Sequence, residues 1–223
     1  MDGATIQQRI YAGRAKAAQR IGLACTQFRP LTASAPLGNP LGSILAAFNA
    51  GDNKYLVPNL PGDAIWYADF DGRLTQPGDY LVRALDGQTW FIAAQQQLLP
   101  IITVNCNRSI RFSRQSGAGA GVGLQGYNST SPCDPTEVAD LLGTSAGALW
   151  PCSILLGGKQ TASETKLPSG VQQAGWKLML PPSVPVTLQA GDIGTDDLGR
   201  RYVLTAAEQS DTGWRCIAHE VHG

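Results

Sequence analysis

Histidine is nearly absent from this sequence, with two residues in 223. Both stand at the C-terminus, where His219 and His222 form an HEVH sequence. A zinc-binding H-E-x-x-H helix needs histidines four residues apart, so that both rings share one face. A spacing of three at the end of a strand would point the rings to opposite faces. The sequence therefore predicts no metal site and no cofactor.

Charged residues are also scarce, at 15% against roughly 25% in an average soluble domain. Seventeen Lys and Arg balance seventeen Asp and Glu, which gives a formal net charge of zero. A general nucleic-acid binder needs a strongly basic surface, so this balance disfavours that class. A net charge of zero also gives little colloidal protection, and it predicts self-association.

Long apolar runs and targeting signals are missing too. No stretch approaches the ~18 apolar residues of a membrane span, and the N-terminus has no apolar segment of secretory length. We expect a protein made in the cytosol, with no membrane partner. The five cysteines never form C-x-x-C, which indicates free thiols rather than a disulfide framework or a zinc site; they are Cys25, Cys106, Cys133, Cys152 and Cys216.

Motifs that carry chemistry are few. There is no G-x-S-x-G nucleophile elbow, and the G-x-G-x-x-G match at Gly121–Gly126 has no helical sequence after it, as a dinucleotide site requires. Two carboxylate pairs are compatible with a glycosidase, namely Asp69 with Asp71 and Asp196 with Asp197. Both pairs adjoin glycine turns, where aspartate is favoured for local hydrogen bonding. We therefore predict that the protein is not an enzyme.

The one long stretch with helical period runs from Thr5 to Leu23, with Asp2 or Thr5 as its cap. Its apolar stripe is narrow and consists of Ile6, Ile10, Gly13, Ala17 and Ile21. Four basic residues make the segment positive within a neutral protein: Arg9, Arg14, Lys16 and Arg20. They form either a solvated helix face or a protein interface that docks an acidic partner or a neighbouring subunit.

Residues 1–62 are expected to form this helix and a proline-rich extended arm. Five prolines between residues 30 and 62 remove backbone donors and disfavour helix in the residues before them. Within the arm, Ser43–Phe48 is a candidate for one short strand or helical turn. Such an arm runs over a surface, and deleting residues 1–29 is expected to abolish assembly while the remaining β regions stay folded.

Two β regions follow, at 63–114 and 150–223, so the fold class is mainly β. Short apolar runs between Asp-Gly turns predict antiparallel strands that form two small sheets or barrel-like regions. The first-region candidates are 64–70, 79–85, 88–95, 101–104 and 108–112, and the second-region candidates are 150–156, 176–180, 186–188, 200–208 and 214–221.

Residues 115–149 are expected to be a Gly/Ser-rich loop or linker between the two regions. Glycine and serine at this density favour a flexible segment over regular structure. This loop is the second candidate interface, toward a neighbouring subunit or a central channel, and its glycines are Gly117, Gly119, Gly121, Gly123 and Gly126. The alternative is a plain linker.

The two β regions also resemble one another. QPGDYLVRALDGQTWFIAAQQ (Gln76–Gln96) matches QAGDIGTDDLGRRYVLTAAEQ (Gln189–Gln209) when one residue is dropped before Gly199. Each copy predicts a Gly-Asp turn, a short strand, a second glycine turn and an aromatic-led return strand. Two related modules and convergent hairpin chemistry are both compatible with this match.

Three segments carry a resemblance to virion structural proteins of tailed bacteriophages. They are TIQQRIYAGRAKAAQRIGL with the following FRP, GDYLVRALDGQTWFIAAQQQLLPIITVNCNR, and GDIGTDDLGRRYVLTAAEQSDTGWRCIA. The last segment is similar to small β proteins of the head-to-tail connector. The resemblance covers about a third of the chain and consists of strand and turn patterns.

The resemblance implies a subunit of a head-to-tail connector or tail adaptor in the virion, synthesised in the host bacterial cytoplasm. Its implied partners are copies of itself in a ring and the portal and tail proteins, with non-specific proximity to DNA in a channel. A tail-fibre attachment or baseplate-like protein is the alternative within the same class. A carbohydrate-binding β module is the alternative from another class, with exposed tryptophans stacking on sugars; the candidates are Trp66, Trp90, Trp150, Trp176 and Trp214.

Overall fold

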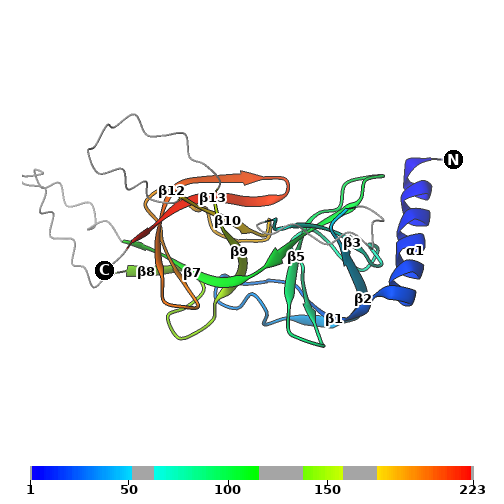
Figure 1. Ribbon diagram of the computed structural model, residues 1–223, viewed down its shortest axis with the longest axis horizontal. Coiled ribbons are helices and arrows are strands. Elements are labelled where there is room, and N and C mark those ends of the chain that lie inside the picture. The colour runs from blue at the N-terminus through cyan, green and yellow to red at the C-terminus, as the bar shows by residue number, and fades with distance from the viewer. Residues whose placement is uncertain (1, 52–62, 116–137, 158–174, 222–223) are drawn as a thin grey trace, which may run out of the picture.

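The computed structural model describes residues 2–51, 63–115, 138–157 and 175–221. Within these ranges the chain forms one helix, α1 (Gly3–Ile21), and thirteen strands. The molecule is elongated, with α1 at one end and the strands of the second β region at the other (Figure 1). The mainly β fold with an N-terminal helix and two antiparallel β regions is confirmed.

The first β region is a closed antiparallel barrel of six strands. Around the ring the order is β1-β2-β3-β6-β5-β4, and β4 pairs back to β1. The strands are β1 (Leu23–Phe28), β2 (Pro40–Asn49), β3 (Ile65–Asp69), β4 (Tyr80–Arg83), β5 (Thr89–Ala94) and β6 (Ile101–Cys106). The barrel therefore begins inside the segment that the sequence assigned to the arm.

The second β region contains seven strands in the order β11-β12-β13-β10-β9-β7-β8. Because β11 also pairs with β7, six of these strands form a closed ring of pairings and β8 extends from β7. The strands are β7 (Arg108–Gln115), β8 (Val138–Leu142), β9 (Trp150–Leu156), β10 (Gly175–Leu180), β11 (Ile193–Asp196), β12 (Arg201–Ser210) and β13 (Gly213–Val221).

The two rings have the same topology. When β7, β9, β10, β11, β12 and β13 are matched in chain order with β1 to β6, both rings follow the order first, second, third, sixth, fifth, fourth. The residue register agrees as well. Phe48 lies opposite Ala68 in the first ring, and Ile154 lies opposite Leu178 at the matching place in the second.

Irregularities of pairing fall at matching places too. The β5–β6 register shifts between Ile92 and Ala94, and the β12–β13 register shifts between Leu204 and Ala206. The sequence match aligns Ile92 with Leu204, so the two shifts begin at equivalent residues. Convergent hairpin chemistry accounts for a shared turn but not for a shared six-strand order with the same bulge. The chain therefore contains the same six-strand β module twice.

Strands β8 and β9 together correspond to β2. In the first ring, β2 follows β1 along its whole length. In the second, β8 pairs with the last residues of β7 and β9 pairs with the first ones, while residues 143–149 lie between them. An insertion in the second copy thus splits one long strand into two, which gives thirteen strands instead of twelve.

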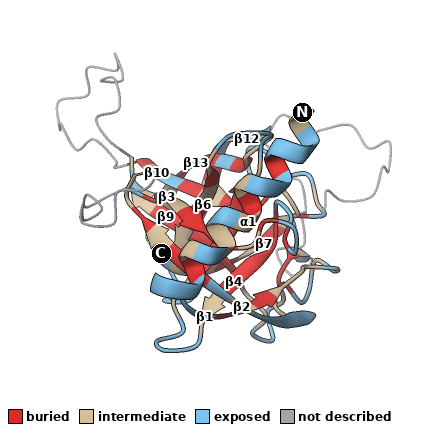
Figure 2. Ribbon diagram, turned by 90° about the vertical axis from the view of Figure 1, so that its right-hand side faces the viewer, coloured by how far each residue is buried: buried red, intermediate tan, exposed pale blue. Residues whose placement is uncertain are grey.

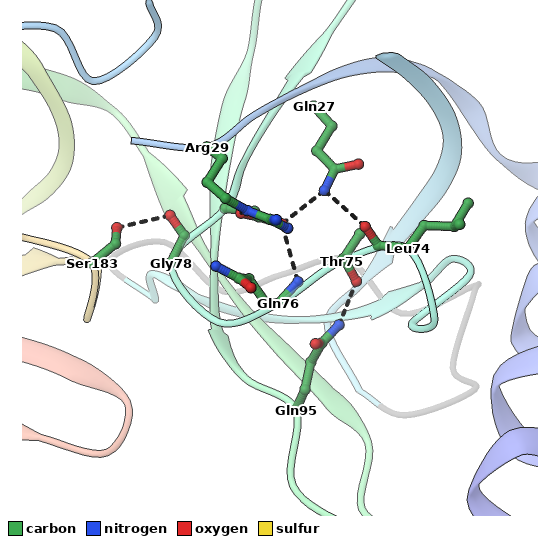
Figure 3. Close-up of polar contacts among 9 residues, drawn as sticks. Gln27, Arg29, Leu74, Thr75, Gln76, Gly78, Gln95 and Ser183 are labelled. Carbon is green, nitrogen blue, oxygen red and sulfur yellow. Dashed lines mark hydrogen bonds and ion pairs between the residues drawn. The ribbon is translucent and has the colours of Figure 1, made fainter. Parts of the chain in front are cut away.

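A buried carboxylate holds the closing pair of strands in each ring. In the first ring Asp79 is 0% exposed, and the Arg29 guanidinium donates to both of its oxygens at 2.8 Å. Gln27 Nε2 donates to Oδ2 at 2.7 Å and the Gln76 backbone N–H at 3.0 Å. Figure 3 shows Arg29 and Gln27 of the β1 end converging on this turn.

The second ring repeats the arrangement. Asp192 is 1% exposed, and the Arg114 guanidinium donates to its two oxygens at 2.7 and 2.9 Å. The backbone N–H of Gln189 donates to Asp192 at 2.7 Å. The preceding glycines, Gly78 and Gly191, have φ of 92° and 93°, a conformation that glycine adopts without steric cost.

One hydrophobic core joins the two rings. The outward faces of β4, β5 and β6 contribute Tyr80, Phe91 and Val104 to the same cluster as Trp150 of β9. The Tyr80 hydroxyl donates to the Pro151 carbonyl at 2.7 Å, and the Tyr80 and Trp150 rings meet edge to face. The two β regions therefore fold as one packed unit.

Two boundaries predicted from sequence were wrong. The arm ends before residue 40, because β2 pairs with β1 and β3 in the barrel and Pro40 occupies the first strand position, where no donor is needed. The preceding stretch lies on the second ring instead, where the Ala33 carbonyl accepts from Trp150 Nε1 at 2.7 Å. The linker predicted to run to residue 149 contains β8.

The candidate strand at 186–188 is not a strand. Pro181, Pro182 and Pro185 precede it and remove the donors that a ladder needs. Leu188 is nevertheless buried in the shared core, which explains its apolar character.

We predict that Asp79→Asn and Asp192→Asn each lower the free energy of unfolding by about 3 kcal/mol, as expected when a buried ion pair loses one partner. The amide would place an NH₂ group against donors. Asp86→Asn is the matched control, because Asp86 pairs with Arg83 at the exposed surface, where such pairs contribute little. Urea unfolding of the three variants checks this, and equal effects would contradict it.

Candidate functional site

Helix α1 is defined by its caps. The Asp2 side chain accepts from the Thr5 backbone N–H at 2.8 Å, which confirms Asp2 as the cap. At the other end Gly22 donates to the Ala18 carbonyl at 2.8 Å and leads directly into β1. A Cβ on Gly22 would lie 2.5 Å from that carbonyl, so glycine permits the close junction. No helix in the described residues is long and apolar enough to cross a membrane.

Only a narrow line of α1 packs on the first barrel. Gln7, Tyr11 and Ala18 are buried, and they recur at the spacing of one helix face. The predicted apolar stripe is therefore displaced: Ile6 and Ile21 are 37% and 50% exposed. Figure 2 shows the helix crossing this end of the molecule with most of its surface exposed.

Arg14 belongs to the buried line rather than to the outward surface. Its Nη1 lies 2.6 Å from Asp69 Oδ1, and both side chains are largely buried, at 13% and 3% exposure. Asn49 Nδ2 donates to the other Asp69 oxygen at 3.3 Å. Of the four basic residues predicted to dock a partner, Arg14 thus holds the helix on its own barrel.

The other three basic residues, Arg9, Lys16 and Arg20, are exposed. At 3.6 residues per turn they lie opposite the buried line. Together with the exposed Ile6 they form what we call the α1 surface. Exposed apolar side chains rimmed by polar ones occur on protein-binding surfaces.

The glycine-rich candidate interface lies outside the described residues. Its five members are Gly117, Gly119, Gly121, Gly123 and Gly126. The structure therefore leaves this prediction as it stood. The same holds for the G-x-G-x-x-G match and for Cys133 and His222.

Asp71 and Asp196, one from each predicted carboxylate pair, accept hydrogen bonds within local turns. Asp71 binds Arg73, and Asp196 accepts from the backbone N–H groups of Leu198 and Arg200 at 2.9 and 2.8 Å. The turn interpretation is confirmed for both. Asp69 differs, because it receives Arg14 from α1, a contact that only the tertiary fold creates.

The mouth of the first barrel is hollow. It lies at the end where β1 begins and β2 ends, and its volume is about 470 Å³. Its walls include Leu23, Phe48, Trp66, Arg83, Gln88 and Trp90. Sequence reasoning named the two tryptophans among possible sugar platforms but did not place them together.

The four described cysteines are free and protonated. Burial raises the pKa of Cys25 to about 11 and that of Cys216 to about 12, and it raises the pKa of Cys106 and Cys152 as well. Thiolate is the nucleophilic form, so none of these thiols is reactive near neutral pH.

No protein-family model, no curated protein and no solved structure matches this chain. The geometry of the α1 surface and the barrel mouth, together with the sequence resemblance, is therefore the basis for assigning a function.

We predict that Arg14→Ala lowers the free energy of unfolding by about 3 kcal/mol, because it removes the guanidinium that pairs with the buried Asp69 carboxylate. Arg9→Ala, Lys16→Ala and Arg20→Ala are matched controls on the same helix and should each change it by less than about 0.5 kcal/mol. Thermal unfolding checks the contrast, and a tolerated Arg14→Ala would refute the anchoring role.

We also predict that a Cys133→Ser variant shows no thiol reaction with an aromatic disulfide reagent at pH 8 while folded, and four reacting thiols in denaturant. Fast labelling of the folded variant would contradict the burial.

The same pKa shifts affect stability. Because folding raises the pKa values of these thiols above the ordinary 9.0, the stability that they contribute is present below pH 9.0 and lost as the pH rises above it.

Proposed function

We propose that this chain is a structural subunit of a tailed-bacteriophage head-to-tail connector or tail adaptor. Copies of the chain assemble into a ring that joins the portal or neck to the tail. The observation that carries the proposal is the α1 surface. Helix α1 covers one end of the molecule and buries only one narrow line of side chains, which leaves this surface exposed.

Two surfaces at opposite ends support this role. The α1 surface lies at one end, and the second ring lies at the other (Figure 1). In the second ring β8 pairs only with β7, so it is the one described strand that has a single neighbour among the described strands. Open strand edges add to a neighbour's sheet, and a basic surface docks on an acidic one. A subunit with both can contact a neighbour and a different partner.

The sequence resemblance has a structural counterpart. Its first segment is α1 with β1, its middle segment begins with the β4–β5 hairpin, and its last segment is the matching β11–β12 hairpin with β13. A tail-fibre attachment or baseplate-like protein is the alternative that the same segments allow. The two roles differ in which virion protein the chain binds.

The deletion of residues 1–29 is not a suitable test. It would remove β1 and Arg29, and with them the closure of the first barrel. Charge reversal on α1 tests the same surface and leaves the barrel intact, together with the Arg29–Asp79 ion pair that closes it.

We predict that Arg9→Glu, Lys16→Glu and Arg20→Glu combined abolish a large complex that the wild-type chain forms with portal or tail proteins of its own genome. Reversal of exposed basic residues on the second ring, Lys177→Glu, Arg201→Glu and Arg215→Glu combined, is the matched control for charge. Light scattering gives the mass of each mixture. A wild-type chain that remains monomeric alone and with every virion component would refute the connector role.

A further inference from the structure

The mouth of the first barrel contains a buried donor without an acceptor. Trp90 is 1% exposed and lines the hollow, and no described residue accepts from its indole Nε1–H. Buried polar groups are nearly always hydrogen-bonded, and each exception needs an explanation. Here the group lies in the wall of a hollow of about 470 Å³, within the range of small-molecule sites.

The duplicated module shows what the same position looks like when it is satisfied. Tyr202 is the counterpart of Trp90, and its hydroxyl donates to Asp196 Oδ2 at 3.1 Å. Burial and the neighbouring carboxylate raise the pKa of Tyr202 to about 12, so the phenol keeps its proton. Trp176 meets the Tyr202 ring edge to face at 5.9 Å. At the mouth of the second ring, the protein itself therefore supplies the acceptor for the Tyr202 hydroxyl and the packing partner for its ring.

In the first mouth the counterpart of Asp196 is Arg83, which supplies no acceptor. Its guanidinium lies 4.9 Å from the Trp90 ring centroid and binds Asp86, so the rim carries no net charge. Arg83 also donates to Gln88 Oε1 at 2.6 Å, which leaves the Gln88 NH₂ group as a further donor. Trp90 Nε1–H and the Gln88 NH₂ group are donors of this mouth that lack an acceptor among the described residues, while the amide of Asn49, which also lines it, donates to Asp69. A ligand with acceptor oxygens satisfies these two donors.

The remaining walls are aromatic. Phe48 and Trp90 stack at 3.9 Å with an interplanar angle of 8°, and Trp66 is half-exposed at the rim. Trp66 matches Trp176, and the position of Tyr202, on which Trp176 packs, is taken by Trp90. A partly exposed tryptophan face offers a platform for another flat or apolar surface.

We propose that this mouth binds a neutral saccharide. The apolar face of one sugar ring lies on Trp66, and its oxygens accept from Trp90 Nε1 and Gln88 Nε2. A compact ring suits the shape, because the buried side chains of Leu81 and Ile92 fill the barrel behind Trp90. An extended peptide needs a groove that is open at both ends, so a peptide is the less suitable occupant. This site does not depend on the proposed virion role.

The test is a titration of the full-length ¹⁵N-labelled chain, with the five tryptophan indole N–H signals followed by NMR. The probes are neutral hexoses, N-acetylhexosamines and their disaccharides at millimolar concentration, and a neutral proline-rich peptide for comparison. Trp90→Phe identifies the Trp90 signal. We expect one of the saccharides to shift that signal downfield, as a new hydrogen bond does.

Two variants then separate the site from general packing. Trp66→Ala should weaken saccharide binding by at least about tenfold, whereas Trp176→Ala, the same position in the other copy, should leave it unchanged. Trp90→Phe keeps the stack on Phe48 but removes the donor, and should weaken binding by about fivefold. A single cooperative melting transition of Trp90→Phe shows that the variant is folded.

Three results would overturn the proposal: no saccharide shifts the Trp90 signal, the peptide shifts it instead, or Trp66→Ala and Trp176→Ala weaken binding equally. Because the light-scattering test uses α1 variants and this one uses barrel variants, the two proposals fail independently.

Discussion

Each ring closes where its first and fourth strands meet, and a buried aspartate stands at that junction. Arg29 and Asp79 are 50 positions apart, and Arg114 and Asp192 are 78 apart, so each ion pair joins distant parts of the chain. An isolated buried carboxylate is costly, but an arginine fork and backbone N–H groups compensate for its lost hydration. The pair is thus satisfied only when the ring is closed. Closure of the β regions, and with it the platform for α1, depends on this interaction.

Local turns could be predicted from the sequence, but ring closure could not. Gly-Asp and Asp-Gly signals indicated the hairpins, and their match between the two copies indicated the duplication. Strands β1, β8 and β11 were missed, because short strands without strong alternation are recognised only by their partners. Arg29 and Arg114 correspond in the strand register, where Phe28 lies opposite Tyr80 and Ser113 opposite Ile193. Their different separations from the aspartates, 50 and 78 positions, hide this correspondence in the sequence.

The helix illustrates the same limit. Its existence and cap followed from period and capping chemistry, but its orientation did not. The apolar residues Ile6 and Ile21 indicated one face, while the buried line is made by Gln7, Tyr11, Arg14 and Ala18. Arg14 lies in that line because Asp69 of β3 requires a cation, and no local pattern predicts a partner 55 positions away. Burial of a polar pair thus overrides the hydrophobic period.

Duplication explains how one small chain acquires two different ends. Both copies keep the buried arginine–aspartate pair that closes the ring. They differ at positions that take no part in this closure. The first copy has α1 on its side and a donor-rich mouth, whereas the second has a mouth closed by Tyr202 and Asp196 and a strand split by residues 143–149. Among the described strands β8 has the single neighbour β7, so this part of the second copy differs from the corresponding β2 of the first, which pairs on both sides. Two identical modules would present the same surface twice, whereas these two copies present different ones.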